Sequence, residues 1–352
     1  SGTTGAPKGA TLTHHNILNN AFFCGAIMGL TPQDRICIPV PLYHCFGMVV
    51  GVLAALTRGS TIVLPSASFE PDAVLNAIEK QRCTAVYGVP TMFIGMLAST
   101  LFKTYDLSSL RTGIMGGAPC PIDIMRRIIR DMYLTDMTIA YGMTETSPVS
   151  FQTRVDADLK TRTETVGTVH PFVEARVVDA DGRVASVGSI GELHIRGYSV
   201  MAGYWGNQKQ TAETISESGW LATGDLATLD QQGRCKIVGR SKDMIIRGGE
   251  NIYPVEIENF LIEHTKIIDI SVFGIDDPVM GEEVCAWIRC SEPLSEEEVR
   301  HHCEGKLAHY KIPRFIRFVE EFPMTVTGKA QKYAMREQEK ILRGNTPSLK
   351  GF

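Results

Sequence analysis

The front half of the chain alternates short β-branched runs with amphipathic segments. Residues 61–64 and 84–87 carry a strand-like pattern. Between them, residues 71–81 place apolar side chains at the spacing of one helix face, at Val74, Leu75 and Ile78. Pro71 suits the first turn of that helix. Because a strand, a helix and a second strand in this order form a βαβ unit, we predict a parallel sheet.

This arrangement repeats along the chain and then changes. Residues 111–115 and 137–140 predict two further strands, and residues 122–129 predict a helix between them. From about Val166 the pattern becomes short alternating strands separated by Asp-Gly and Gln-Gly turns, at residues 175–178, 193–196 and 235–238. We expect a small antiparallel barrel or sheet there.

The part of the chain after Arg240 has its own pattern. Residues 254–264 predict a helix, residues 268–273 a strand, and Ser295 with Glu298 forms the capping box of another helix. The predicted fold class is therefore α/β, with a mixed, largely parallel sheet layered with helices, a small β-barrel-like subdomain and a separate small C-terminal α+β domain. The predicted divisions are residues 1–165, 166–240 and 241–343, with a tail at 344–352.

The composition is that of an ordinary globular protein. Of the 352 residues, 44% are hydrophobic and 21% are charged, and the net charge of -4 offers no basic excess to recruit nucleic acid or anionic lipid. The longest apolar run, residues 46–56, falls short of the roughly 18 to 20 residues that span a bilayer, so it predicts a buried helix. The nine cysteines are spaced singly, which favours reduced, buried thiols over disulfides.

The first nine residues have the composition of a polyphosphate-binding loop, with the sequence Ser1-Gly2-Thr3-Thr4-Gly5-Ala6-Pro7-Lys8-Gly9. Glycines let backbone N–H groups turn toward an anion, the threonines offer hydroxyl donors, and Lys8 supplies a cation. The order differs from that of P-loop NTPases, whose lysine follows the last glycine. The alternative is a flexible Gly/Thr-rich terminus.

A second polar loop, Tyr141-Gly142-Met143-Thr144-Glu145-Thr146, follows a predicted strand. Ligands bind at the carboxyl ends of parallel strands. Tyr141 could stack on a base, Thr144 could donate to a phosphate, and Glu145 offers the oxygen ligand that Mg²⁺ prefers. The alternative is a turn followed by a solvated glutamate. The segment Gly116-Gly117-Ala118-Pro119 ends another predicted strand, where backbone without bulky side chains could approach a flat base.

Polar segments toward the C-terminus add weaker signals. Asp225 lies on a predicted tight turn, where a carboxylate could accept both hydroxyls of a ribose, although aspartate also forms turns by itself. Residues 239–243 combine charges with glycine at the predicted boundary, as a hinge or a plain linker would. Residues 248–254 form a second glycine loop entering a helix. Lys329 ends a polar loop, where lysines are usually just solvated.

In this order, the motifs resemble those of the adenylate-forming superfamily of acyl-CoA synthetases, firefly-type luciferases and peptide-synthetase adenylation domains. The resemblance extends to about residue 335 and is similar in detail to the medium-chain acyl-CoA ligase branch. The matches are residues 1–9, Tyr43-His44, residues 141–145, Thr223-Gly224-Asp225, residues 239–243 and Gly328-Lys329.

The resemblance implies catalytic roles. Thr144 would bind the α-phosphate of ATP, Glu145 would bind Mg²⁺, and Lys329 would be a movable cation. His44 would orient the substrate carboxylate, the alternative being a core imidazole. Lys242 would be the hinge about which residues 241–343 swing between the two half-reactions.

The resemblance also implies binding residues, which fall into four groups. Those for the β- and γ-phosphates are Thr3, Thr4 and Lys8, and Ser1 and Gly5 of the same segment are also cofactor-binding. Those for adenine are Gly116, Gly117, Ala118, Pro119 and Tyr141, and the adjacent Gly142 is also cofactor-binding. Those for the ribose are Asp225 and Arg240, and those for coenzyme A are Gly248, Gly249, Glu250 and Asn251.

The implied activity is an AMP-forming ligase that joins a medium-chain fatty acid to ATP, giving an acyl-adenylate, and then to coenzyme A. Residues 1–165 and 166–240 would belong to one large AMP-binding domain. Family members carry a long segment before the first loop, so an inactive nucleotide- or acyl-binding remnant is one alternative, and an adenylating enzyme with another acyl acceptor is a second. The implied partners are small-molecule substrates, without nucleic acid or a transmembrane segment. The implied compartment is the mitochondrial matrix, or the cytoplasm for a bacterial protein.

Overall fold

The computed structural model describes residues 8–118, 120–324 and 330–344. These residues divide into two compact units. The larger unit holds residues 8–223 and 227–237, and the C-terminal unit holds residues 224–226 together with the described residues from 238 onward. Each unit has its own hydrophobic core.

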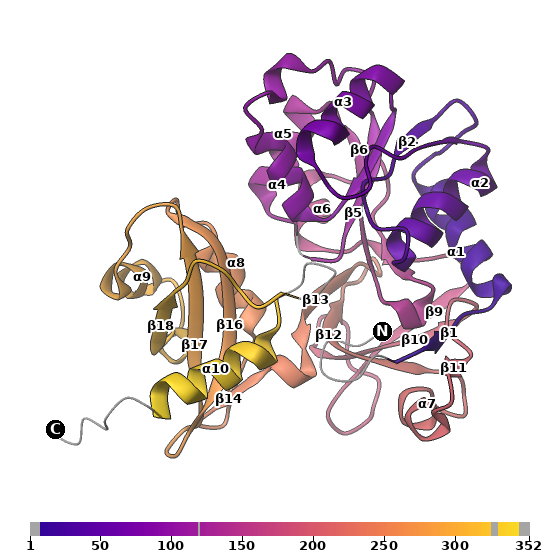
Figure 1. Ribbon diagram of the computed structural model, residues 1–352. Coiled ribbons are helices and arrows are strands. Elements are labelled where there is room, and N and C mark those ends of the chain that lie inside the picture. Colours follow the sequence, from indigo (N-terminus) through magenta and orange to yellow (C-terminus); the bar gives the residue numbers. More distant parts are fainter. Residues whose placement is uncertain (1–7, 119, 325–329, 345–352) are drawn as a thin grey trace. The chain divides into compact units, whose positions relative to one another are not determined.

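A mixed seven-stranded sheet forms the centre of the larger unit (Figure 1). Its strands are β2 (Arg35–Cys37), β3 (Thr61–Val63), β4 (Ala85–Gly88), β5 (Thr112–Gly116), β6 (Asp136–Gly142), β7 (Val149–Gln152) and β8 (Thr168–Val169). The order is β3-β2-β4-β5-β6-β7-β8. Neighbours from β3 to β6 are parallel, whereas β7 and β8 are antiparallel. The predicted mixed, largely parallel sheet is confirmed.

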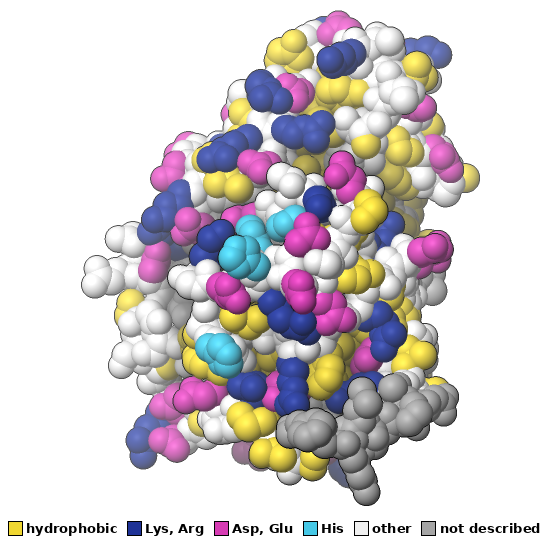
Figure 2. Space-filling model, turned by 90° about the vertical axis from the view of Figure 1, so that its left-hand side faces the viewer, with side chains coloured by type: hydrophobic (Ala, Val, Ile, Leu, Met, Phe, Trp, Pro, Cys, Tyr) yellow, Lys and Arg dark blue, Asp and Glu magenta, His cyan; other side chains and the backbone are white. Residues whose placement is uncertain are grey.

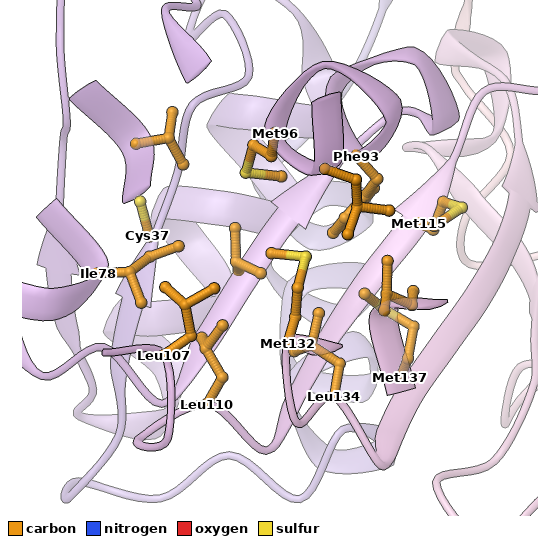
Figure 3. Packing of buried hydrophobic residues seen from close by; sticks show 14 of the residues in the cluster. Cys37, Ile78, Phe93, Met96, Leu107, Leu110, Met115, Met132, Leu134 and Met137 are labelled. Carbon is orange, nitrogen blue, oxygen red and sulfur yellow. The ribbon is translucent and has the colours of Figure 1, made fainter. Parts of the chain in front are cut away.

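Helices of the larger unit cover both faces of this sheet. They are α1 (His14–Ile27), α3 (Pro71–Gln81), α4 (Pro90–Ala98), α5 (Ile122–Asp131) and α6 (Leu159–Glu164), with short 3-10 helices η2 (Phe102–Thr104) and η3 (Thr144–Thr146). Successive strand side chains point to opposite faces. On β4, Val86 packs in the cluster that contains residues of α3, α4 and α5, while Tyr87 packs in the cluster that contains residues of α1. Figure 3 shows Phe93 and Met96 of α4 over the strands that carry Met115 and Met137.

The apolar run at residues 46–56 is helical but not uniformly buried. Phe46–Leu53 form a π-helix, η1, and Ala54–Arg58 form α2. A Cβ on Gly47 would lie 2.3 Å from the carbonyl oxygen of Pro41, so glycine permits that close approach. Leu56, however, is 62% exposed. The prediction of a helix is therefore confirmed, but the prediction that it is buried is wrong at its C-terminal end.

Two smaller sheets complete the middle of the chain. The first has the order β13-β12-β10-β9, with β9 (Val173–Val178), β10 (Gly191–Gly197), β12 (Leu221–Leu229) and β13 (Cys235–Arg240). This four-stranded sheet occupies the stretch for which a small antiparallel barrel or sheet was expected, and β9 and β10 pair antiparallel. The second pairs β1 (Ala10–Thr11) with β11 (Gly203–Tyr204), and α7 (Gln208–Thr214) follows β11.

The C-terminal unit packs helices against a five-stranded sheet (Figure 1). Its strands are β14 (Ile245–Arg247), β15 (Glu250–Ile252), β16 (Ile267–Asp277), β17 (Gly281–Cys290) and β18 (Phe315–Phe318). Its helices are η4 (Ser241–Asp243), α8 (Pro254–Leu261), α9 (Glu296–Cys303), η5 (His309–Lys311) and α10 (Lys332–Gly344). The predicted capping box is confirmed, because Glu298 N donates to Ser295 Oγ at 3.1 Å and Ser295 N donates to Glu298 Oε2 at 2.8 Å.

The cysteines match the expectation of unpaired thiols. All nine are free, and eight are buried, with Cys290 half-buried. Burial raises the pKa of most of them, including Cys45 and Cys303. The cysteines whose pKa burial raises therefore remain protonated thiols at neutral pH.

The surface carries mixed charge. Figure 2 shows Lys and Arg side chains interspersed with Asp and Glu over one face. None of the described helices is both long enough and apolar enough to cross a membrane.

Candidate active site

The glycines of the proposed adenine site lie at the carboxyl ends of two neighbouring parallel strands. Gly116 ends β5 and pairs with Ala140 of β6, and a Cβ on Gly116 would lie 3.1 Å from the Ala140 carbonyl oxygen. Gly117 has φ +87°, a conformation that favours glycine. Ala118 follows as an exposed residue, and Pro119 lies outside the described residues. The structure therefore confirms that Gly116 and Gly117 lie at the end of a strand, as predicted from the sequence.

The loop after β6 has a tightly packed backbone. Tyr141 is half-buried beside Phe151, with ring centroids 6.3 Å apart. A Cβ on Gly142 would lie 1.8 Å from the Pro148 carbonyl oxygen, so only glycine fits. Met143 N donates to that same oxygen at 3.0 Å. These contacts fix the direction in which η3 leaves the sheet.

Glu145 is a buried carboxylate. It is 3% exposed, so it is not the solvated turn residue of the alternative interpretation. Tyr204 Oη donates a hydrogen bond to Glu145 Oε1 at 2.9 Å, and Met201 N donates to the Glu145 carbonyl oxygen at 2.9 Å. Burial first, and then the charge of Glu145, raises the pKa of Tyr204 to about 12. The phenol is therefore a hydrogen-bond donor at neutral pH.

Lys8 lies over the ring of the same tyrosine. Its Nζ is 5.2 Å from the centroid of the Tyr204 ring, within cation–π range. The β1–β11 pairing holds the chain that follows Lys8 against Tyr204, and Trp205 N donates to the Gly9 carbonyl oxygen at 2.7 Å. Lys8 and Glu145 thus share one neighbour. The other predicted phosphate-loop residues, Ser1, Thr3, Thr4 and Gly5, lie outside the described residues.

His44 and Thr144 are linked by a cysteine between them. Cys45 Sγ is 3.7 Å from Thr144 Oγ1 and 3.9 Å from His44 Nδ1. Phe46 N donates to His44 Nδ1 at 3.1 Å, so a neutral imidazole carries its proton on Nε2. His44 is half-buried rather than enclosed in a core. Its Nε2–H has the chemistry to donate to a carboxylate.

Asp225 and Arg240 form an ion pair. Arg240 Nε lies 3.3 Å from Asp225 Oδ1, and the Asp225 side chain is 12% exposed. The expectation of a tight turn at Asp225 is wrong, because the residue lies inside β12. Gly224 has φ +74°, which makes the strand locally irregular. The glycine that was interpreted as part of a turn therefore lies within the strand. A pair of this kind can present carboxylate oxygens to ribose hydroxyls.

The predicted hinge residue lies in a short exposed turn. Lys242 is exposed in η4, where Met244 N donates to the Arg240 carbonyl oxygen at 3.1 Å. Asp243 Oδ1 lies 3.7 Å from Arg336 Nη2 of α10. The turn is therefore tied to the helix that follows Lys329 in the sequence.

The second glycine segment is a hairpin turn rather than a loop that enters a helix directly. Gly248 and Gly249 connect β14 to β15 with φ values of +58° and +88°, as a two-residue type I′ turn requires. Glu250 and Asn251 lie in β15 and are exposed. The helix starts only after that strand, at Pro254.

A buried carboxylate supports this hairpin. Glu283 is 0% exposed and accepts from Arg247 Nε at 2.7 Å and Arg314 Nη1 at 2.9 Å. Burial alone would raise the pKa of Glu283, but the two arginines outweigh it and lower that pKa below its usual value. Because folding lowers the pKa of Glu283, its ionised carboxylate stabilises the folded state fully at neutral pH. This stabilisation is lost as the pH falls through the pKa of Glu283 in the folded state.

We expect Glu283→Gln to lower the free energy of unfolding of the C-terminal unit by about 3 kcal/mol, because it leaves two arginines without their shared carboxylate. Urea unfolding at neutral pH measures the change, with the exposed residue Glu292 changed to Gln as the matched control. The difference between the variants should shrink at acidic pH. Equal stability of the two variants at neutral pH would contradict this account.

Lys329 lies outside the described residues, but the described residues on either side of it make defined contacts. Met324 and Ala330 form a β-bridge, and Gln331 N donates to the Pro323 carbonyl oxygen at 2.8 Å. Beyond the loop, Lys332 Nζ lies 2.8 Å from Glu258 Oε1 of α8. The described residues that precede and follow Lys329 in the sequence are therefore held within the C-terminal unit.

The predicted site residues form separate groups. In the larger unit, the structure connects His44, Thr144, Glu145 and Lys8 through Cys45 and Tyr204, close to the strand ends at Gly116 and Tyr141. In the C-terminal unit it pairs Asp225 with Arg240. Sequence reasoning gave no role to Tyr204 or Cys45. No local signal marks them, since Tyr204 is 59 positions from Glu145.

Comparisons with known proteins agree on one family. The pattern described as "AMP-binding enzyme" matches residues 1–205, and that described as "AMP-binding enzyme C-terminal domain" matches residues 256–329. The medium-chain acyl-CoA ligase ACSF2 of Danio rerio, named as mitochondrial, is 51% identical over 96% of this chain and 57% of its own length. The putative acyl-CoA synthetase YngI of Bacillus subtilis is 50% identical over 96% of this chain and 62% of its own.

A solved structure has the same fold. ATP-bound MatB from Rhodopseudomonas palustris superposes with a TM-score of 0.89 at 32% identity, covering 97% of this chain and 67% of MatB. This chain therefore spans somewhat more than half the length of the curated relatives it matches. With two family patterns, close relatives and a shared fold in agreement, the chain belongs to the AMP-binding enzyme family.

Proposed function

We propose that this chain acts as a fatty acid–CoA ligase for medium-chain acids, an AMP-forming acid–thiol ligase. In the first half-reaction a carboxylate oxygen attacks the α-phosphorus of ATP and pyrophosphate leaves. In the second, the thiolate of coenzyme A attacks the acyl carbon and AMP leaves. Family membership supports the reaction class, and the names of the two relatives support the substrate.

The observation that carries the proposal is the continuous set of polar contacts in the larger unit. It runs from His44 through Cys45 to Thr144, and from the adjacent Glu145 through Tyr204 to Lys8. A donor for a carboxylate, a hydroxyl, a buried acid and a cation thus lie together beside the carboxyl ends of parallel strands.

These groups suit the charge problem of the first half-reaction, in which a carboxylate approaches an anionic phosphate. The Nε2–H of His44 would orient the substrate carboxylate, since Nδ1 already accepts from Phe46 N. The Thr144 hydroxyl and the Lys8 ammonium would offset charge on the phosphates. Fixed donors and cations of this kind stabilise the transition state because they need no reorganisation during the reaction.

Mg²⁺ fits the residues around Glu145. Magnesium sites in nucleotide enzymes use one or two carboxylates together with substrate phosphates, and Glu145 is buried with one oxygen already fixed by a donor. Within the described part of the chain, no group of three or more His, Cys, Asp or Glu side chains could hold a metal by itself. Bound there, Mg²⁺ would neutralise phosphate charge.

The C-terminal unit would supply the remaining groups. In the proposal Asp225 and Arg240 bind the ribose, Lys329 acts in adenylate formation, and the turn of Gly248 and Gly249 with Glu250 and Asn251 meets coenzyme A. Lys242 would be the hinge about which the chain rotates between the two half-reactions. We also propose that the domains divide after residues 165, 240 and 343, as predicted from the sequence. The compartment is proposed as the mitochondrial matrix by likeness to ACSF2, although a bacterial relative is as similar.

Octanoate tests the proposed function. We expect this chain, given ATP, Mg²⁺ and octanoate, to release pyrophosphate, and to form octanoyl-CoA once coenzyme A is added. A series of acids from acetate to palmitate measures the preference, with a maximum expected at medium length because each buried CH₂ contributes about 0.8 kcal/mol until the binding site is full.

Each other outcome identifies an alternative. Pyrophosphate release without a CoA thioester, but with an amide after amines are added, would replace coenzyme A by another acceptor. Binding of nucleotide without pyrophosphate release from any acid would identify an inactive remnant. Activity on acetate or palmitate alone would overturn the medium-chain assignment while keeping the reaction class.

A further inference from the structure

We propose that Tyr204 is a positioning residue for metal binding, because its hydroxyl fixes the carboxylate of Glu145 while its ring contacts Lys8. This inference rests on the part of the proposed function that makes Glu145 a metal ligand, and on the proposed reaction for its activity readout. It assigns a role to a residue that lies at the end of β11, far in sequence from both of its partners.

The segment around Tyr204 holds Glu145 at two points. Met201 N donates to the Glu145 carbonyl oxygen at 2.9 Å, which fixes the backbone. Tyr204 Oη donates to Glu145 Oε1 at 2.9 Å, which fixes the side chain. Because both the backbone and the carboxylate of Glu145 are hydrogen-bonded, the side chain has little freedom to rotate. The direction of its oxygens is therefore set before any ligand binds.

Tyr204 is itself rigidly placed. Tyr204 N donates to Thr211 Oγ1 of α7 at 2.9 Å, and the Thr211 hydroxyl donates to the Asn207 carbonyl oxygen at 2.9 Å. A Cβ on Gly203 would lie 2.7 Å from Thr211 Cγ2, so β11 and α7 are in close contact. Contacts with α7 therefore fix the backbone of β11 at Tyr204, and with it the position of the phenol.

The same strand connects Tyr204 to the chain that follows Lys8. Ala10 pairs with Tyr204 and Thr11 with Gly203, and Trp205 N donates to the Gly9 carbonyl oxygen at 2.7 Å. Lys8 Nζ lies 5.2 Å from the ring centroid of Tyr204. The ring of Tyr204 thus contacts Lys8, and its hydroxyl contacts Glu145.

Removing only the hydroxyl separates positioning from packing. Tyr204→Phe keeps the ring over which Lys8 lies and removes the donor to Glu145. A partner that orients a metal ligand typically contributes 10- to 100-fold to metal affinity, so we expect the Mg²⁺ midpoint to rise by about 10-fold or more. The matched control is Tyr133→Phe, because Tyr133 is 52% exposed and makes neither contact.

Metal binding and activity are measured independently. Mn²⁺ binding with a non-hydrolysable ATP analogue is followed by electron paramagnetic resonance, and the Mg²⁺ dependence of pyrophosphate release is followed in parallel. We expect both midpoints to shift in Tyr204→Phe and neither in Tyr133→Phe, with similar melting temperatures.

The outcomes distinguish the two proposals. Unchanged Mn²⁺ and Mg²⁺ midpoints in Tyr204→Phe, or a lower melting temperature with unchanged midpoints, would overturn the role of Tyr204. If the wild-type chain released no pyrophosphate, the proposed function would fail, and the Mn²⁺ titration would still decide the positioning role.

Discussion

Replacing Lys329 with alanine is expected to lower adenylate formation by about 10²- to 10³-fold, the cost of removing one charge-stabilising donor from a transition state. In the second half-reaction the bond that breaks joins the acyl carbon to the phosphate oxygen, and no bond to phosphorus forms. In the proposal Lys329 is withdrawn during this step, so its side chain takes no part in it. Thioester formation from supplied acyl-adenylate should therefore stay close to that of the wild-type chain. Pyrophosphate release and acyl-CoA formation, measured separately, give the two rates.

The control for this variant is another lysine on the helix that follows. Lys340 pairs with Asp276 at 3.2 Å with both side chains about half or more exposed, so Lys340→Ala should leave both half-reactions unchanged. An equal loss of the two half-reactions in Lys329→Ala would contradict a role confined to adenylate formation. So would a loss of the same size in Lys340→Ala, because it would indicate general damage to α10.

Sequence patterns correctly predicted those helices and strand ends that are specified by residues close together in the sequence. The helix expected at residues 71–81 has those bounds as α3, and the helix expected at 122–129 is α5, Ile122–Asp131. In both, proline at the start and one apolar face are enough to specify the helix. The strand-end placement of Gly116 and Tyr141 followed from the same alternation.

Features that depend on distant contacts could not be predicted in this way. Asp225 looked like a turn residue because Gly224 precedes it, yet pairing in the sheet places it inside β12. The two glycines before Glu250 indicated a loop, whereas their positive φ values close a hairpin whose second strand is only three residues long. The hydrogen bond from Tyr204 to Glu145 joins β11 to η3, which are far apart in the sequence, so no local sequence pattern predicts it.

Replacing Lys242 with proline is expected to have the opposite effect to Lys329→Ala. Proline holds φ near −65°, which a 3-10 turn such as η4 accepts, so the chain should fold and keep adenylate formation. A swing about this residue needs its backbone angles to change, and proline prevents much of that change. Thioester formation should then fall by on the order of 100-fold, as a misplaced reacting group does. Octanoyl-CoA production compared with pyrophosphate release measures the effect.

Lys242→Ala separates the backbone from the side chain. Lys242 is exposed, so alanine removes its charge while leaving the backbone free to rotate, and both half-reactions should continue at near wild-type rates. Loss of thioester formation in both variants would assign the effect to the ammonium group, and full thioester synthesis by Lys242→Pro would remove the hinge from residue 242. Since Arg336 ties the neighbouring Asp243 to α10, a hinge at 242 would carry Lys329 and the turn of Gly248 and Gly249 together as one body.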